Sequence, residues 1–161
     1  MNPKLKIYLD TSVPNFIFAD DAPEKRDITK EFYRAVEKNI YEIYISELVL
    51  EEINDAPEPK KEQLADLIRR VAPALLEITE EAKELAGFYV ERGIVPEKKM
   101  ADAIHVAVAM IFDLDALVTW NYRHLANLRK SELFHGAGLE KRYFKKVELV
   151  TPMEVLSDEI R

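Results

Sequence analysis

The sequence predicts an α/β domain built on a parallel β-sheet, and two observations lead to this fold class. Short apolar runs alternate along the chain with longer segments whose apolar residues recur at helical spacing. This alternation is typical of strands joined by helices that cross back over a sheet. The chain has 161 residues, a length suited to one domain with a sizeable core. We therefore expect a single domain over residues 1–161.

The first part of the chain predicts two strands, at residues 4–9 and 42–45, which are short and largely apolar. Between them, apolar residues at helical spacing predict a helix over residues 23–37. Asp20 and Asp21 precede this helix and are good N-cap residues. This stretch therefore predicts one strand–helix–strand unit.

The middle of the chain continues the alternation. Helices are expected at about residues 46–54 and again after Pro59, which breaks the chain. Residues 75–78 predict a third strand. Thr79 is placed to cap the next helix, and Gly93 is placed to end it.

The last part of the chain supplies two more strands. A helix over about residues 97–112 is apolar nearly all round in its second half, so we expect it near the centre of the fold. Residues 116–119 and 146–150 predict strands, separated by a helical or irregular excursion over about 129–143. A terminal helix is expected over about residues 152–160.

Composition excludes several kinds of site. The absence of cysteine rules out disulfides, thiol catalysis and zinc sites with cysteine ligands. His105, His124 and His135 are scattered, which argues against a histidine-rich metal site. No apolar run approaches the length of a membrane span. The N-terminus, Met1–Lys4, leads into the first strand without a signal-peptide pattern. We therefore expect a cytoplasmic protein.

The net charge of −7 opposes nucleic-acid binding, but the charge is unevenly distributed. Between Trp120 and Val150, seven Lys or Arg residues stand against three Glu, which leaves a local balance of +4. This segment is either an ordinary solvated surface or a basic rim beside an acidic pocket.

Three acidic residues stand in apolar surroundings. Asp10 ends the first expected strand, Glu52 lies among Leu, Val and Ile residues, and Asp102 opens an apolar helix. In an open parallel sheet, ligands bind beyond the carboxyl ends of strands. Asp10 and Asn121 follow two such ends, and Asp102 near a helix N-terminus can face the same edge. Like charges brought together there are unfavourable unless a cation neutralises them. The pattern therefore predicts a hard oxygen site for Mg²⁺ or Mn²⁺.

Glu52 has two close competitors, Glu47 and Glu51. On a helix that begins at Ser46, Glu52 falls on the face that carries the apolar residues, whereas Glu47 and Glu51 fall on a more polar side. We favour Glu52 as the carboxylate of the site and keep Glu51 as the alternative, because helix boundaries read from sequence shift easily.

At these residues the sequence resembles the PIN-domain nucleases, in particular the toxin ribonucleases of VapC–VapB modules. Residues 8–12 (Tyr-Leu-Asp-Thr-Ser) look like the opening acidic motif of the family, and residues 45–53 look like its strand-to-helix Ser/Thr…Glu motif. Residues 100–109 closely match the third motif, and residues 117–121 occupy the place of the fourth. The resemblance implies a three-layer PIN-like fold with a five-stranded parallel sheet flanked by helices.

The resemblance also implies a metal-dependent endoribonuclease. Asp10 and Asp102 would hold Mg²⁺ or Mn²⁺, with Glu52 as a further ligand or as the group that positions or deprotonates the attacking water. Asn121 would be an auxiliary ligand. Contacts to the RNA substrate are expected from Ser12, Thr119, Arg123 and His124. A toxin of a type II toxin–antitoxin module would pair with an antitoxin protein that occupies the acidic pocket, and a homodimer is expected.

Asn121 is a departure, because many family members carry aspartate at this position. An amide oxygen can coordinate a hard cation but adds no charge, so the number of bound ions stays open. Together with the acidic net charge, Asn121 supports an alternative: a catalytically weak or inactive PIN-like protein that binds RNA or protein. A phosphatase with an aspartyl nucleophile is disfavoured, because Ser12 stands where its second aspartate is expected. A receiver domain is disfavoured as well, since the late lysine that it needs in a strand-end loop is not evident.

Two groups of residues are expected to be structural. His105 shares a helix face with Asp102 and is expected to lie in the core or behind the site. Trp120 and the Tyr and Phe residues show no interleaving with basic residues along the chain. We therefore expect them in the core or at an interface, and not as platforms that stack on bases.

Overall fold

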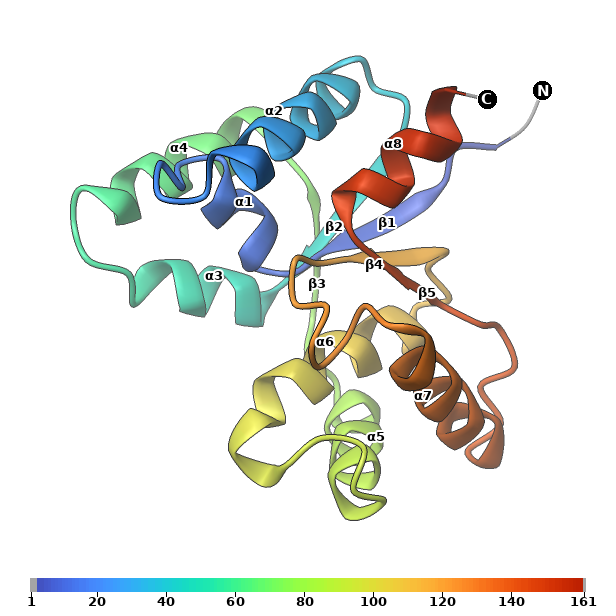
Figure 1. The fold of residues 1–161 in the computed structure, drawn as a ribbon. Coiled ribbons are helices and arrows are strands. Elements are labelled where there is room, and N and C mark those ends of the chain that lie inside the picture. Colours follow the sequence, from blue (N-terminus) through green and yellow to red (C-terminus); the bar gives the residue numbers. More distant parts are fainter. Residues whose placement is uncertain (1–2, 161) are drawn as a thin grey trace.

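Figure 1 shows the fold of the computed structural model. The structure describes the backbone of residues 3–160 and the side chains of residues 3–157; Met1, Asn2 and Arg161, at the ends of the expected domain, lie outside the described residues. Five parallel strands form one sheet in the order β3-β2-β1-β4-β5. The strands are β1 Lys6–Leu9, β2 Glu42–Ser46, β3 Ala74–Leu76, β4 Ala116–Val118 and β5 Glu148–Val150. The predicted α/β fold with a five-stranded parallel sheet is confirmed.

Helices cover both faces of this sheet, as the connections between parallel strands require. The helices are α1 Ser12–Phe16, α2 Pro23–Glu37, α3 Glu47–Asn54, α4 Lys60–Val71, α5 Glu80–Glu91, the 3₁₀ helix η1 Glu97–Lys99, α6 Met100–Ile111, α7 Leu128–Glu140 and α8 Pro152–Ile160. Helices α1, α2, α4 and α8 lie on one side of the sheet, and α5, α6 and α7 lie on the other (Figure 1). No helix in the described part of the chain is long and apolar enough to cross a membrane.

The core continues through the sheet. Ile7 and Tyr8 are successive residues of the central strand and point to opposite faces, yet both are fully buried. Helix α6 is buried along most of its length, including Val106 and Ala107, as its apolar composition predicts. Burying one large apolar side chain contributes about 1.5–3 kcal/mol. The core therefore fixes the two helices and the strands that carry the site described below.

The structure differs from expectation in two places near the first strand. Helix α1 was not expected, since five residues are too few to display helical periodicity. The predicted capping of α2 by Asp20 or Asp21 is wrong: the N-cap is Ala22, without a side-chain cap, and Asp20 pairs with Arg26 at 2.9 Å. A nearby charged partner competes with the backbone N–H groups for the aspartate.

Candidate functional site

Three segments that follow adjacent strands meet at the carboxyl edge of the sheet. Asp10 directly follows β1, and its backbone N–H donates to the carbonyl of Val118, the last residue of β4. The β1–β4 register pairs Leu9 with Val118, so Asp10 lies beside the start of the segment after β4, at Thr119. Helix α3, which carries Glu52, follows β2 on the other side of β1. The strand order therefore brings together side chains far apart in sequence.

Asp10 is buried and is held by hydroxyl groups. Its Oδ1 accepts from Ser12 Oγ at 2.6 Å and from Ser12 N at 3.1 Å, and its Oδ2 accepts from Thr119 Oγ1 at 2.5 Å. Burial raises the pKa of Asp10, and this outweighs the lowering by His105 and by the bonds from Ser12 and Thr119. The hydrogen bonds and the charge of His105 therefore do not fully offset the cost of burying the negative charge of Asp10.

Ser12 and Thr119 use their hydroxyl groups within the protein. Ser12 Oγ also accepts from the backbone N–H of Trp120 at 2.9 Å, and Thr119 Oγ1 accepts from that of Asn121 at 2.9 Å. Both residues were expected to contact substrate. In this arrangement they fix Asp10 and the segment after β4.

Glu52 is half-buried and faces the same edge, whereas Glu51 is exposed and Glu47 accepts from the backbone N–H of Ile78. Glu52 Oε1 accepts from Thr11 Oγ1 at 2.6 Å and lies 2.9 Å from His105 Nε2. Burial alone would raise its pKa, but the bonds from His105 and Thr11 outweigh burial and lower the pKa. Both contacts use Oε1, which leaves Oε2 without a hydrogen-bond partner among the described residues.

A chain of buried hydrogen bonds supports Glu52 from behind. The Tyr8 hydroxyl lies 2.6 Å from His105 Nδ1 and 2.7 Å from Ser46 Oγ. One proton assignment satisfies every contact: Ser46 donates to Tyr8, Tyr8 donates to Nδ1, and the proton on Nε2 of His105 is donated to Glu52. This tautomer is inferred from the hydrogen bonds. Burial raises the pKa of Tyr8, which keeps its hydroxyl protonated and able to donate.

Asp102 lies in the first turn of α6 and is oriented by Asn121. The Asn121 amide nitrogen donates to Asp102 Oδ2 at 3.3 Å, and its amide oxygen accepts from the backbone N–H of His124 at 3.0 Å. An N–H group can only donate, so this contact fixes which end of the amide faces Asp102. Asn121 therefore acts as a donor to Asp102, and its oxygen, expected to be an auxiliary metal ligand, is already engaged.

The charges around Asp102 come from several elements. Burial raises its pKa, the charge of Glu52 adds to the rise, and His105, Lys99 and His124 lower it. The pKa is raised overall. His124 is half-buried, and Arg123, its exposed neighbour, has a side chain on the surface.

The three carboxylates lack strong cationic partners within the protein. In the ion pairs of the described residues, neither Asp10 nor Asp102 takes part, and Glu52 pairs with His105 alone. No three His, Asp or Glu side chains of the described part gather closely enough to enclose a metal ion. Mg²⁺ normally keeps several waters and is held by one or two carboxylates. The donor chemistry therefore fits an open, hydrated cation site, and a closed cage is absent from the described residues.

The supporting residues Tyr8, Thr11 and the His105–Glu52 contact were not expected from the sequence. The sequence pattern could have indicated a supporting role for Tyr8, because a phenol inside an apolar strand needs a buried hydrogen-bond partner. The sequence did not identify that partner, which lies 97 residues away.

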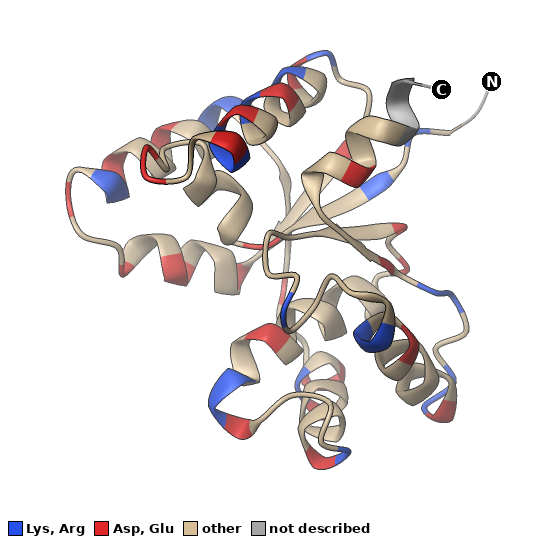
Figure 2. Cartoon of the chain, in the orientation of Figure 1, with Lys and Arg blue, Asp and Glu red and all other residues tan. Residues whose placement is uncertain are grey.

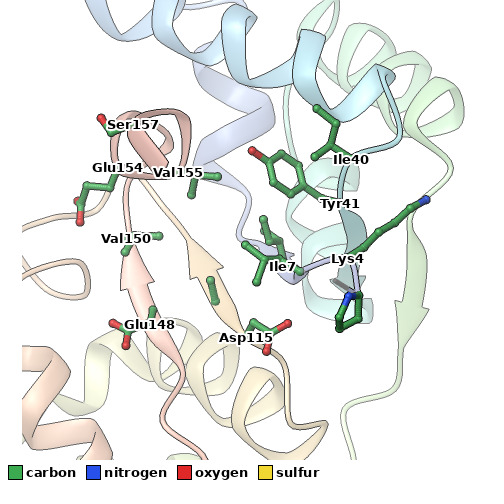
Figure 3. Close-up of a pocket in the computed structure, with 13 residues that line it drawn as sticks. Lys4, Ile7, Ile40, Tyr41, Asp115, Glu148, Val150, Glu154, Val155 and Ser157 are labelled. Carbon is green, nitrogen blue, oxygen red and sulfur yellow. The ribbon is translucent and has the colours of Figure 1, made fainter. Parts of the chain in front are cut away.

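A groove of about 1060 Å³ opens at the opposite edge of the sheet and is mainly apolar (Figure 3). Its lining includes Asp115 and Glu148, which lie at the amino ends of β4 and β5. Asp115 is already bound by Lys145 Nζ at 2.6 Å and by the backbone N–H of Lys6 at 2.7 Å. Because Asp115 is paired with Lys145 and Glu148 is exposed to solvent, we place the candidate site at the carboxyl edge, where Asp10 is buried without an ion-pair partner among the described residues.

The surface has no single basic face among the described residues. Figure 2 shows Lys and Arg interspersed with Asp and Glu over the helices of both layers. Attraction of a nucleic acid therefore depends on a few local cations and on any bound metal ion, since the net charge is −7.

Comparisons with known proteins agree with this geometry. The family model described as PIN domain matches residues 7–131. Among solved structures, the crystal structure of VapBC2 from Rickettsia felis bound to a DNA fragment from their promoter aligns with a TM-score of 0.59 and 14% identity. The alignment covers 91% of this chain and 98% of that chain, and at this identity it shows a shared fold. No curated protein matches the sequence.

Proposed function

Because this chain belongs to the PIN domain family, whose members are generally nucleases, we propose that it is a metal-dependent endoribonuclease. The observation that carries the proposal is that Asp10 and Asp102 both bind the segment after β4, through Thr119 and Asn121, and that the charge of Glu52 acts on Asp102. Among the ion pairs of the described residues, none joins a Lys or Arg to any of these three acids. This is the arrangement that the sequence resemblance implies for the family.

The residues have separable roles in this proposal. Asp10 and Asp102 hold Mg²⁺ or Mn²⁺, directly or through water, with Glu52 as a nearby third carboxylate. When bound, the divalent cation supplies a Lewis acid that neutralises negative charge developing on the phosphate oxygens. Burial raises the pKa values of both aspartates, so their ionised forms lack full compensation within the protein, and a bound cation would supply it.

Glu52 is proposed as the group that orients and deprotonates the attacking water. Thr11 and His105 hold Oε1 and lower the pKa of the carboxyl group, so it is ionised at neutral pH. Its Oε2 is available to accept a proton from water. Asn121 orients Asp102, and Arg123 and His124 are placed to contact the RNA backbone at the rim.

We further propose that the chain is the toxin of a cytoplasmic type II toxin–antitoxin module. The support is the structure of VapBC2 bound to a DNA fragment from their promoter, which shares the fold. An antitoxin segment carrying arginine would pair with the carboxylates of Asp10, Glu52 and Asp102, none of which forms an ion pair with Lys or Arg among the described residues. A homodimer is part of the same proposal.

A second candidate is a PIN-like protein that binds RNA or protein with little or no cleavage. Two observations favour it: the amide oxygen of Asn121 accepts from the backbone N–H of His124, and no three acidic or histidine side chains of the described residues are grouped closely enough to hold a metal ion. Cleavage of single-stranded and structured RNA by antitoxin-free protein, with Mn²⁺, Mg²⁺ or EDTA, separates the two candidates. Metal-dependent cleavage that is lost in Asp10→Asn and Asp102→Asn supports the nuclease. Cleavage that persists in both variants, or RNA binding without cleavage in either metal, rejects it.

A further inference from the structure

Lys25, at the start of α2, lies among three aromatic rings. Its Nζ is 4.9 Å from the ring centroid of Tyr122, 5.4 Å from that of Phe16 and 5.7 Å from that of Trp120. These distances are within the range of cation–π attraction. The sequence showed no interleaving of basic and aromatic residues, and the expectation that the aromatics are only core or interface residues is incomplete. The interleaving forms in space, between α1, α2 and the segment after β4.

One short segment joins this lysine–aromatic cluster (Phe16, Lys25, Trp120 and Tyr122) to the candidate site. Thr119 donates to Asp10, and Asn121, two residues later, donates to Asp102. Tyr122 is the next residue. The same four-residue stretch therefore contacts both aspartates and carries the aromatic ring that lies against Lys25.

The inner part of the cluster is fixed, and its outer part is open. Trp120 is buried, and its indole N–H donates to Thr29 Oγ1 at 2.8 Å. Thr29 in turn donates to the backbone carbonyl of Lys25 at 2.6 Å, which ties the tryptophan to α2. Tyr122 is 55% exposed. Among the ion pairs of the described residues, none involves Lys25, so no carboxylate there neutralises its ammonium group.

We propose that Tyr122 and Lys25 form a subsite for one nucleotide of single-stranded RNA, adjacent to the acidic edge. An unpaired base stacks on the exposed Tyr122 ring, and the Lys25 ammonium neutralises a neighbouring phosphate. Trp120 and Phe16 form the fixed wall behind them. This inference rests on the proposed function, because it assigns the substrate of that site.

The subsite distinguishes single-stranded from double-stranded RNA more than it distinguishes one base from another. Every base has a π-face, so stacking on tyrosine tolerates any sequence, whereas a base inside a duplex is already stacked and paired. In a chain with a net charge of −7, a lysine that takes part in none of the ion pairs of the described residues also provides local attraction for a phosphate.

The test is fluorescence anisotropy with a fluorescein-labelled single-stranded RNA and with its duplex. The parent is Asp102→Asn, which we expect to bind without cleaving. In that background, Tyr122→Ala is expected to weaken single-strand binding about tenfold, and Tyr122→Phe is expected to retain it. Lys25→Gln is expected to reduce the slope of log affinity against log salt by about 0.7.

Two variants serve as matched controls in the same parent. Phe144→Ala removes an aromatic ring that is 72% exposed and lies next to Lys145 in sequence, far along the chain from the cluster. Lys30→Gln removes an exposed lysine from the same helix as Lys25. Neither control is expected to change affinity or salt dependence. Circular dichroism of each variant checks folding. If Tyr122→Ala does not fold, the slope of log affinity against log salt for Lys25→Gln still tests the subsite.

The outcomes separate the two proposals. If wild-type protein cleaves RNA but Tyr122→Ala and Lys25→Gln bind like their controls, the subsite is rejected and the nuclease stands. Equal affinity of the parent for duplex and single strand also rejects the subsite. If the parent binds no RNA and the wild type cleaves none, both proposals are rejected.

Discussion

The imidazole Nε2 of His105 lies 2.9 Å from Oε1 of Glu52, so a buried histidine on α6 holds a carboxylate on α3. The opposite ring nitrogen of His105 lies 2.6 Å from the Tyr8 hydroxyl, in the central strand of the sheet. The candidate water-activating group is thus linked through His105 to the central strand of the sheet, and its Oε2 has no hydrogen-bond partner among the described residues.

Replacing His105 with alanine is expected to reduce the kcat of RNA cleavage by about 10–100-fold, because Glu52 loses the donor that orients it. The KM is expected to change little, since His105 is buried and does not reach the substrate. The matched control is His135→Ala. In the wild-type protein, Nδ1 of His135 is buried without a hydrogen-bond partner among the described residues. A similar loss of kcat in both variants would count against the positioning role.

The choice of Glu52 over its neighbour is testable with isosteric amides. Glu52→Gln is expected to abolish RNA cleavage, because the amide cannot accept a proton from water at neutral pH. Glu51→Gln changes the same charge one residue away, on an exposed side chain, and is expected to cleave like wild type. Initial rates of both variants with Mn²⁺ decide between them; activity in Glu52→Gln would refute the assignment.

Tyr8→Phe is expected to lower the free energy of unfolding by about 1–3 kcal/mol, because Ser46 and the buried Nδ1 of His105 both lose a partner. Tyr89→Phe is the control: Tyr89 is equally buried, but its hydroxyl donates to the weakly accepting sulfur of Met110. Tyr89→Phe is expected to lower the free energy of unfolding by less than Tyr8→Phe does. Urea unfolding of both variants measures the difference, and equal losses would argue against a special role for the Tyr8 contacts.

A divalent cation is expected to stabilise the fold. Mn²⁺ or Mg²⁺ binds the folded site and not the unfolded chain, so each should raise the Tm of wild-type protein, and EDTA should reverse the rise. Asp10→Asn and Asp102→Asn remove the main proposed ligands and should show little or no shift. Differential scanning fluorimetry across a metal titration provides the measurement. A wild-type Tm that is unaffected by either metal would favour the binding-module alternative.

The raised pKa of Asp102 predicts how stability depends on pH in metal-free protein. The folded state holds the Asp102 proton more tightly than the unfolded chain, whose aspartate has its ordinary pKa of 3.8. Stability due to this residue is therefore lost as pH rises from about 3.8 through the raised folded value. Wild-type protein should lose stability relative to Asp102→Asn across that window. Urea midpoints in EDTA at several pH values test this, and a difference that is constant with pH would contradict it.

Local patterns were sufficient for the elements that carry the acids. The apolar run before Asp10 predicted β1, and Ser46 caps α3 through Leu48 N at 3.2 Å, as its position before a helix implied. The helical face that carries Val49 and Ile53 singled out Glu52. The PIN-domain resemblance is confirmed by the family model over residues 7–131. These features depend on neighbours within a few residues, which the sequence displays directly.

What the sequence determined is the five strands, the longer helices and their order, because periodicity and capping act over one or two turns. It also placed Asp10 at the end of a strand, Asp102 in the first turn of a helix and Glu52 on the apolar face of another helix. The tertiary structure decided which atoms meet: the amide nitrogen of Asn121 faces Asp102, His105 joins Tyr8 to Glu52, and Lys25 lies against Tyr122. Each of these contacts joins residues at least 19 positions apart in the sequence. Their geometry follows from strand order, register and helix packing, and no local pattern of residues encodes it.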